Sequence, residues 1–219
     1  MKVLILIDAK NFENGVVNLS KKRKEFRFVD WYKLNVFIID YLKKNLQYKD
    51  CDLKHIRTYF YTGEFTDKLI QKVEKYFGDN PESVEVKDLI ERLKKDKEKQ
   101  ENFFKIAKNY YFFEIKTKPL QFSYSDKKIF QKGVDVQLAV DLVDFAHKNV
   151  YGVAVLLSGD IDLLESITNA KSMGKQIIIF GDESVTAEEI KRYSDMFIDI
   201  GRFDEEQLNK FTHILEIKK

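Results

Sequence analysis

The sequence predicts an α/β fold, specifically a three-layer α/β/α sandwich with a mainly parallel central sheet. Residues 3–7 and 153–157 read VLILI and VAVLL, two short runs without a polar residue. Such runs are typical of strands that are buried on both faces of a sheet. Around them, segments with strand patterns alternate with segments that carry apolar residues at helical spacing. This alternation favours parallel strands joined by helical crossovers.

The first half of the chain begins with the strand at 3–7. The pattern of residues 12–29 predicts a polar connection between two elements, and this connection carries a basic run at 21–24. A helix follows, for which Asp30 is a plausible N-cap. Residues 94–101 contain no apolar side chain, so we expect a solvated helix end or a loop there. The other predicted elements are a strand, a helix, a turn and a helical stretch, at 55–61, 65–77, 79–81 and 84–108.

The second half shows a clearer pattern. Its predicted strands lie at 110–115, 153–157, 176–180 and 196–200. Its predicted helices lie at 136–147, after Asp160, at 186–192 and at 204–217. We expect one domain over residues 1–200, with elaborations at about 12–29 and 63–104. Residues 201–219 then form a C-terminal helical extension.

Composition narrows the kinds of site that the chain can build. The chain of 219 residues has 38 Lys and Arg against 36 Asp and Glu, so its net charge of +2 does not by itself indicate a nucleic-acid-binding protein. One Cys and three scattered His exclude a Cys-based zinc finger and point to oxygen ligands for Mg²⁺ or Mn²⁺. The apolar run at 3–7 is shorter than a signal-peptide core, and no stretch is long enough to span a membrane. We therefore expect a soluble, cytoplasmic protein.

Acidic residues follow the predicted strands. Asp8 comes directly after the first strand, Asp160 and Asp162 follow residues 153–157, and Asp135 opens a helix. Because ligands bind at the carboxyl ends of parallel strands, these side chains are candidates for one site. Clustered carboxylates repel one another unless a cation neutralises them. One or two Mg²⁺ or Mn²⁺ ions held there would suit phosphodiester cleavage.

Simpler explanations exist for several of these residues. Asp135 and Asp160 could each cap a helix, whereas Asp8 ends a buried strand with no obvious helix after it. Asp141 lies six residues after Asp135, which is about 240° around a helix, so the two do not share a face. Asp141 is a candidate for the second shell of the site, or a solvated residue.

Three segments resemble the signature motifs of LabA-like NYN domains, a branch of the PIN-like nuclease superfamily. Residues 5–11, ILIDAKN, resemble the opening IDGxN strand. Residues 132–141, KGVDVQLAVD, resemble the motif KGVDVxLAxD, and residues 155–164, VLLSGDIDLL, with Gly174-Lys175 resemble SGDxDFxPL…GK. The resemblance implies a PIN-like sandwich and a metal-dependent ribonuclease site.

Position by position, the resemblance implies roles for individual residues. The implied catalytic, metal-binding carboxylates are Asp8, Asp135, Asp160 and Asp162. Asn11 and Ser158 would position these carboxylates or the substrate phosphate. Ala9-Lys10 departs from the usual Gly-Ser or Gly-Glu, and Lys10 could contact phosphate or be a surface residue. Lys132, which precedes Asp135, is a further candidate for phosphate contact.

Substrate contacts could come from basic segments. The run at 21–24 follows the strand that carries Asp8 and could track a phosphate backbone, whereas 94–99 suits a solvated, Lys-rich surface. Near Lys127, Lys128 and Lys132, aromatic residues could stack on bases or pack at a sheet edge. These aromatic residues are Phe122, Tyr124 and Phe130.

The sequence thus predicts a Mg²⁺- or Mn²⁺-dependent endoribonuclease. DNA stays open as a substrate, because a metal–carboxylate site acts on phosphate and does not itself read the 2′-OH. The alternative is a catalytically weak nucleic-acid-binding or regulatory module, suggested by Ala9-Lys10. Toprim-like and haloacid-dehalogenase-like sites fit less well, because Asp8 stands where the first needs Glu and the second needs Asp-x-Asp. Homo-oligomerisation is also open.

Overall fold

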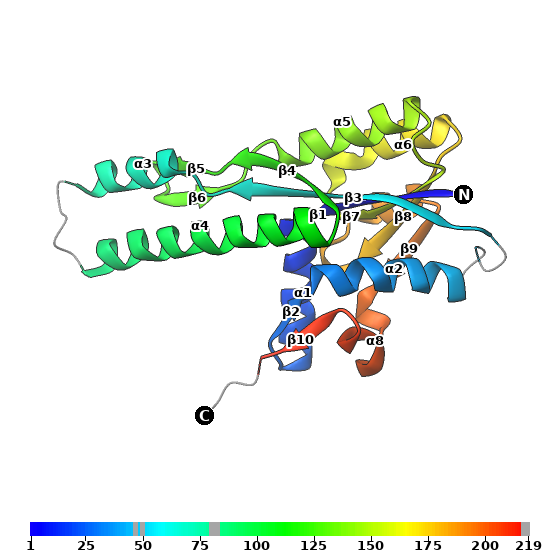
Figure 1. The fold of residues 1–219 in the computed structure, drawn as a ribbon, viewed down its shortest axis with the longest axis horizontal. Helices are drawn as coiled ribbons and strands as arrows, with labels where there is room; N and C mark the ends of the chain where they lie inside the picture. Colours follow the sequence, from blue (N-terminus) through cyan, green and yellow to red (C-terminus); the bar gives the residue numbers. More distant parts are fainter. Residues whose placement is uncertain (46–47, 49–50, 79–83, 216–219) are drawn as a thin grey trace. The chain divides into compact units, whose positions relative to one another are not determined.

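The computed structural model describes residues 1–45, 48, 51–78 and 84–215 (Figure 1). Its contacts divide the chain into two compact units. The first unit contains residues 1–60 and 135–219, and the second contains residues 61–134. The predicted turn at 79–81 lies outside the described residues. The residues after 200 belong to the first unit, and the predicted domain bounds stay a prediction.

The central sheet has six strands in the order β4-β3-β1-β7-β8-β9. The pairs β1–β7, β7–β8 and β8–β9 are parallel. Both apolar runs lie at the centre of the sheet, and Ile5 is paired with Val155. The predicted α/β fold with a mainly parallel sheet is therefore confirmed. The strands are β1 (Lys2–Asp8), β3 (Lys54–Glu64), β4 (Phe113–Pro119), β7 (Val153–Leu157), β8 (Gln176–Gly181) and β9 (Met196–Asp199).

Helices cover both faces of the sheet within the first unit (Figure 1). On one face, Phe12 of α1 (Ala9–Arg23) and Phe37 of α2 (Trp31–Asn45) pack against Phe180 of β8, with ring centroids 6.1 and 6.4 Å away. On the other face lie α5 (Val134–His147) and α6 (Leu164–Ser172). The first unit therefore has three layers, as predicted.

The helix α1 corrects the prediction for residues 12–29. These residues were expected to form a polar connection, but α1 spans Ala9–Arg23 and is followed by the short strand β2 (Arg27–Val29). Its buried residues include Phe12, Val16 and Leu19, which follow helical spacing. Gly15 hides this pattern because glycine disfavours helix. A Cβ at Gly15 would lie 3.2 Å from Asp182 Cβ, so glycine lets α1 pack closely there.

The C-terminal segment also differs from the prediction. The expected helix at 204–217 ends early: α8 spans Glu205–Asn209 and is followed by β10 (Thr212–Ile214), while residues 216–217 lie outside the described chain. β10 pairs with β2 as an antiparallel ribbon. The Arg27 guanidinium is buried beneath this ribbon and donates hydrogen bonds to Asn209 Oδ1 and Thr212 Oγ1, both at 2.9 Å. Distant pairing therefore overrides the local helical pattern.

The second unit contains two helices and a small hairpin. α3 (Asp67–Phe77) begins after the N-cap Thr66, and α4 (Val84–Tyr110) is one continuous helix. Residues 94–101 therefore lie inside α4, and the expected loop or helix end is wrong. Ion pairs support this polar part of α4, including Lys97–Glu101 at 3.3 Å and Lys94–Glu74 at 3.0 Å. The hairpin consists of β5 (Gln121–Ser123) and β6 (Lys128–Phe130), which pair antiparallel.

Aromatic residues of the hairpin have different environments. Phe122 is 7% exposed and packs with Leu69 and Val73 of α3, which contradicts a base-stacking role for it. Tyr124 and Phe130 are exposed.

In the part of the chain that the structure describes, no helix is both long enough and apolar enough to cross a membrane. The remaining elements are the 3₁₀ helices η1 (Ile161–Leu163), η2 (Glu183–Val185) and η3 (Ile200–Arg202) and the helix α7 (Glu188–Tyr193).

Candidate metal centre

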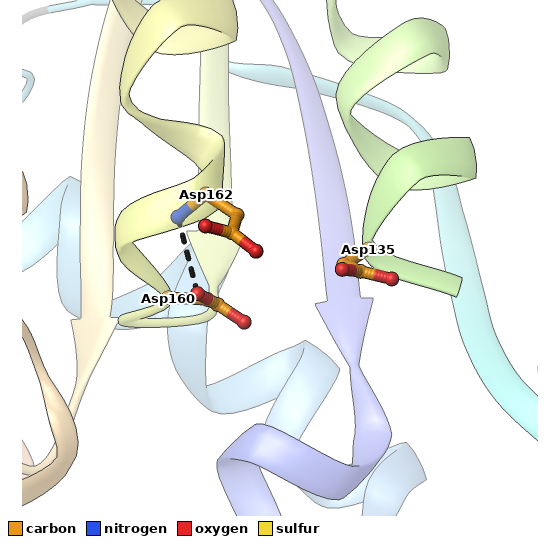
Figure 2. Close-up of side chains that lie close together, drawn as sticks. All are labelled: Asp135, Asp160 and Asp162. Atoms are coloured by element: carbon orange, nitrogen blue, oxygen red, sulfur yellow. Dashed lines mark hydrogen bonds between the residues drawn. The ribbon is translucent and has the colours of Figure 1, made fainter. Parts of the chain in front are cut away.

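Three carboxylates converge beside the carboxyl ends of β1 and β7 (Figure 2). Asp135 lies in the first turn of α5, whereas Asp160 and Asp162 lie where β7 leads through η1 to α6. One carboxylate oxygen of each residue lies within 4.8 Å of those of the other two. Asp135 and Asp160 are half-buried, and Asp162 is exposed. The folded chain thus brings together three of the four carboxylates that the sequence suggested as ligands.

Local backbone bonds fix the two aspartates after β7. Asp160 is the N-cap of η1, and its Oδ1 accepts a hydrogen bond from the Asp162 backbone N–H at 3.1 Å. The capping role considered for Asp160 is therefore present, and its second carboxylate oxygen stays available. Capping holds the Asp160 side chain in place without using up both of its oxygens.

Asp8, the fourth carboxylate, is buried at the end of β1 and is only 5% exposed. The expectation that no helix follows Asp8 is wrong, because Asp8 is the N-cap of α1 and accepts a hydrogen bond from the Asn11 backbone N–H at 3.1 Å. The Ser158 hydroxyl donates a hydrogen bond of 3.4 Å to its other oxygen. Asp8 is not one of the three carboxylates within 4.8 Å, but it is close enough to respond to their charges.

Burial and nearby negative charge raise the pKa of Asp8 from the ordinary value of 3.8 to about 6. Loss of hydration is the largest cause, and the charges of Asp160 and Asp135 add to it. Hydrogen bonds from the Asn11 backbone and the Ser158 side chain oppose the increase. An ionised Asp8 is thus costly at neutral pH unless positive charge lies nearby.

Because ionisation of the buried Asp8 is costly, we expect the folding stability of the metal-free protein to depend on pH. The folded state binds the Asp8 proton more tightly than the unfolded chain, so folding stability decreases as pH rises from 3.8 to about 6. By pH 7 the loss from this group is about 3 kcal/mol. Urea unfolding in EDTA should show about half of this loss, roughly 1.4 kcal/mol, between about pH 5 and about pH 7.5, since the other half is lost below pH 5. Asp8→Asn, which keeps the N-cap, should remove this contribution; an unchanged pH dependence would contradict the assignment.

Two predicted positioning residues connect β1 and β7. The Asn11 side-chain carbonyl accepts a hydrogen bond from the Gly159 backbone N–H at 3.0 Å. Ser158, only 3% exposed, also accepts a 3.4 Å hydrogen bond from the Asp160 backbone N–H. These bonds tie the first turn of α1 to the segment that carries Asp160. The role of Asn11 and Ser158 in orienting the carboxylates stays a prediction.

The other predicted residues are less closely tied to the carboxylates. Lys10 is exposed in the first turn of α1, and Lys132 is exposed in the second unit, three residues before Asp135. Asp141 is half-buried in α5 and lies outside the group of three. The roles suggested for Lys10, Lys132 and Asp141 stay predictions.

The structure adds two residues that the sequence did not single out. Glu13 lies on α1, and its pKa is raised mainly by partial loss of hydration and also by the charge of Asp8, while Lys10 opposes the increase. Recognising α1 as a helix would have placed Glu13 near Asp8. Asp182 directly follows β8, much as Asp8 ends β1, but Lys22 Nζ lies 3.6 Å from Asp182 Oδ1. The same strand-end rule could have found Asp182.

Gly159 permits a close passage between two loops. A Cβ there would lie 2.4 Å from Thr186 Cα and 2.7 Å from the Val185 carbonyl oxygen, distances that no side chain can occupy. The Gly159 carbonyl accepts a hydrogen bond of 3.0 Å from the Ala187 backbone N–H. Only glycine therefore allows the segment that carries Ser158 and Asp160 to pass this close to the backbone after η2.

Comparisons with known proteins agree with this architecture. Residues 2–201 match the family described as NYN domain. An uncharacterized protein of Methanocaldococcus jannaschii is 30% identical over 102 residues, which are 43% of this chain and 42% of that protein. The match thus spans less than half of the archaeal protein. A crystal structure of a protein of unknown function from Vibrio parahaemolyticus superposes with a TM-score of 0.56 at 17% identity, covering 98% of this chain and 96% of that one, and it supports the fold alone.

Proposed function

Because the chain belongs to the NYN domain family, we propose that it is a metal-dependent endoribonuclease that hydrolyses RNA phosphodiester bonds. The family implies a nuclease-like fold. The observation that carries the proposal is the convergence of Asp135, Asp160 and Asp162 oxygens within 4.8 Å of one another, beside the buried Asp8.

The donor set fits a hard divalent cation. Asp135, Asp160 and Asp162 make no ion pair with any Lys, Arg or His among the described residues, so their charges are not neutralised by the protein. Carboxylate oxygens suit Mg²⁺ or Mn²⁺, and no imidazole or thiolate belongs to the group. Asp135, Asp160 and Asp162 would hold the ion, with Asp8 beside them. When bound, such an ion lowers the pKa of water and neutralises charge on the phosphate.

The chain's own groups suit hydrolysis by water. Without a cation, burial raises the pKa of Asp8 to about 6 and also raises the pKa of Glu13, and we assign the transfer of a proton from water to Asp8 because it lies beside Asp135 and Asp160. Ser158 and Asn11 keep Asp8 and the Asp160 segment in register through the hydrogen bonds described above. We assign Lys10, which is exposed in the first turn of α1, to contact with a substrate phosphate. In the reaction, a bond forms between the water oxygen and phosphorus, and the bond from phosphorus to the leaving oxygen breaks.

The proposal predicts metal-dependent cleavage by the purified full chain. Labelled single-stranded RNA incubated with Mn²⁺ or Mg²⁺ should be cut internally, and EDTA should stop the reaction because the carboxylates then lack their counter-charge. Single-stranded DNA of the same sequence, tested in parallel, measures whether the sugar matters. Intact RNA after long incubation with Mn²⁺ would contradict the proposal.

A catalytically weak nucleic-acid-binding module is the second candidate. Ala9 and Lys10 replace residues that are usual in the family motif, and Ala9 is buried at 3% exposure while Lys10 is exposed in the first turn of α1, two residues after Asp8. The positively charged Lys10 side chain could hold a phosphate group of the nucleic acid without promoting its cleavage. Binding of RNA that stays intact in Mn²⁺ would favour this candidate.

A further inference from the structure

The ribbon of β2 and β10 has an exposed face that the proposed function does not use. Phe28 is paired with His213, and the Leu215 backbone N–H donates a 2.8 Å hydrogen bond to the Phe26 carbonyl, which extends the pairing beyond the two strands. Because side chains alternate along a strand, Phe26 and Phe28 share one face with His213 and Leu215, while Arg27 points to the other and is buried. The exposed fractions are 62% for Phe26, 45% for Phe28 and 57% for Leu215.

These two rings are presented as a stacking surface. Phe28 lies in β2 and Phe26 directly precedes this strand, two positions before Phe28, whose ring lies 5.3 Å from the His213 ring. Isolated apolar side chains are common on protein surfaces, but here four neighbouring side chains share one face. Exposed aromatic side chains in alternate positions of a strand are how several sheet proteins stack on unpaired bases.

Positive charge comes directly before the ribbon in the chain. Lys21 and Lys24 are exposed and make no ion pair with the described residues, in contrast to Lys22, whose Nζ is 3.6 Å from Asp182. The nearest acidic residues in sequence already have partners: Glu25 pairs with Arg27, and Asp30 pairs with Lys33 and His213. These unpaired lysines favour a partner that brings negative charge to the ribbon.

Charge also decides between two occupants. A second copy of this chain packed symmetrically on the ribbon would set the same surface against itself, and the acidic residues nearest to it in sequence, Glu25 and Asp30, are already paired. A single-stranded nucleic acid supplies both phosphates for these lysines and bases for the aromatic rings. The observations therefore favour nucleic acid.

The helix α1 connects this ribbon to the carboxylates. Asp8 caps the beginning of α1, and β2 follows its end (Figure 1). At 15 residues, α1 is about 20 Å long. Its exposed side chains Lys10, Asn14, Val17 and Lys21 fall within about 60° of one another around the helix axis, and Lys24 follows at the C-cap. One side of α1 thus offers a path from the carboxylates to the ribbon, with lysines at both ends.

We propose that Phe26, Phe28, Lys21 and Lys24 form a platform for single-stranded nucleic acid, about 20 Å from the carboxylates along α1. Unpaired bases stack on the two rings, and the lysines hold the adjoining phosphates. The inference rests on the proposed function at one point only, namely that the nucleic-acid strand held by the platform is the strand that is cut at the carboxylates.

Binding measured without cleavage tests the platform directly. In EDTA, fluorescence anisotropy with a labelled single-stranded RNA of about 12 nucleotides should show at least about tenfold weaker binding for Phe26→Ala/Phe28→Ala. Both side chains are exposed, so the variant should fold. Tyr110→Ala/Phe112→Ala removes an equally spaced exposed pair from the other unit and should bind as the parent does. Parental affinity of the Phe26/Phe28 variant would overturn the platform.

The salt dependence of RNA binding tests Lys21 and Lys24 separately. Lys21→Gln/Lys24→Gln should make the plot of log affinity against log salt less steep by about 1.4, since each phosphate contact on a single strand contributes about 0.7. Lys105→Gln/Lys108→Gln, a matched exposed pair, should leave the slope unchanged. An unchanged slope in the Lys21/Lys24 variant would contradict phosphate contact at the ribbon.

Two further measurements separate the possible failures. If RNA binding depends on Phe26 and Phe28 but nothing is cut in Mn²⁺, the platform stands and the proposed nuclease activity fails. If Phe26→Ala/Phe28→Ala changes the sedimentation of the protein while RNA binding stays parental, the ribbon is a contact between copies of this chain and the platform is overturned.

Discussion

Replacing Asp160 by Asn is expected to slow metal-dependent RNA cleavage by at least about 100-fold. The substitution removes one negative charge from the three converging carboxylates. The Asn side-chain carbonyl can still accept the hydrogen bond from the Asp162 backbone, so the local turn should persist. The effect exceeds the 10- to 100-fold loss typical of residues that only support a ligand, because Asp160 would itself hold the ion.

The measurement needs a control for charge and a control for folding. Asp40→Asn makes the same chemical change at an exposed position on α2 and should cleave as the parent does. Binding of Mn²⁺, followed by electron paramagnetic resonance, should weaken in Asp160→Asn and not in Asp40→Asn. Urea unfolding establishes that both variants are folded. An Asp160→Asn protein with parental activity and Mn²⁺ affinity would refute the carboxylate site.

Replacing Arg27 by Met is expected to lower the free energy of unfolding by about 3–5 kcal/mol. The Arg27 side chain is fully buried and makes ion pairs with Glu25 and Glu205. It also hydrogen-bonds Asn209 and Thr212, so it connects β2 with α8 and β10. Met preserves most of the aliphatic volume but leaves these polar partners without their donor.

Thermal unfolding should show a decrease in Tm of roughly 6–20 °C. The matched control is Arg192→Met, since Arg192 is exposed on α7 and its replacement should change stability by less than about 0.5 kcal/mol. If Arg27→Met unfolds at the parental temperature, the C-terminal segment is held by its apolar contacts alone. The Phe26 and Phe28 variants leave Arg27 in place, so they test binding rather than this anchor.

Much of the candidate site could be predicted because strand ends are encoded locally. The apolar runs before Asp8 and Asp160 can only be buried strands, and parallel strands place their carboxyl ends at one edge of the sheet. Sequence reasoning therefore identified Asp135, Asp160 and Asp162 as neighbours, although 25 residues separate Asp135 from Asp160 in the numbering. It could not give the place of Asp8 relative to the group of three, which depends on how β1 and α5 pack.

The errors have one physical source in common. Gly15 weakens the local sequence pattern that would predict α1 as a helix. Glycine suits this position because α1 packs closely against Asp182, which lies far along the chain. Residues 212–214 have no local sequence pattern that predicts a strand. They form a strand because β2 is available to pair with them. The polar stretch inside α4 is supported in part by Glu74 and Asp67 of α3.

The sequence alone determined the fold class, the central strands and the acidic residues that follow them, since runs of apolar side chains and the residues that end them are local properties. The tertiary structure decided that Ser158 hydrogen-bonds Asp8, that Gly159 must lack a side chain, and that Phe26 and Phe28 share an exposed ribbon face. Each of these features depends on a partner distant in sequence. Packing and hydrogen-bonding energies arise only when such partners meet, so no local pattern records them.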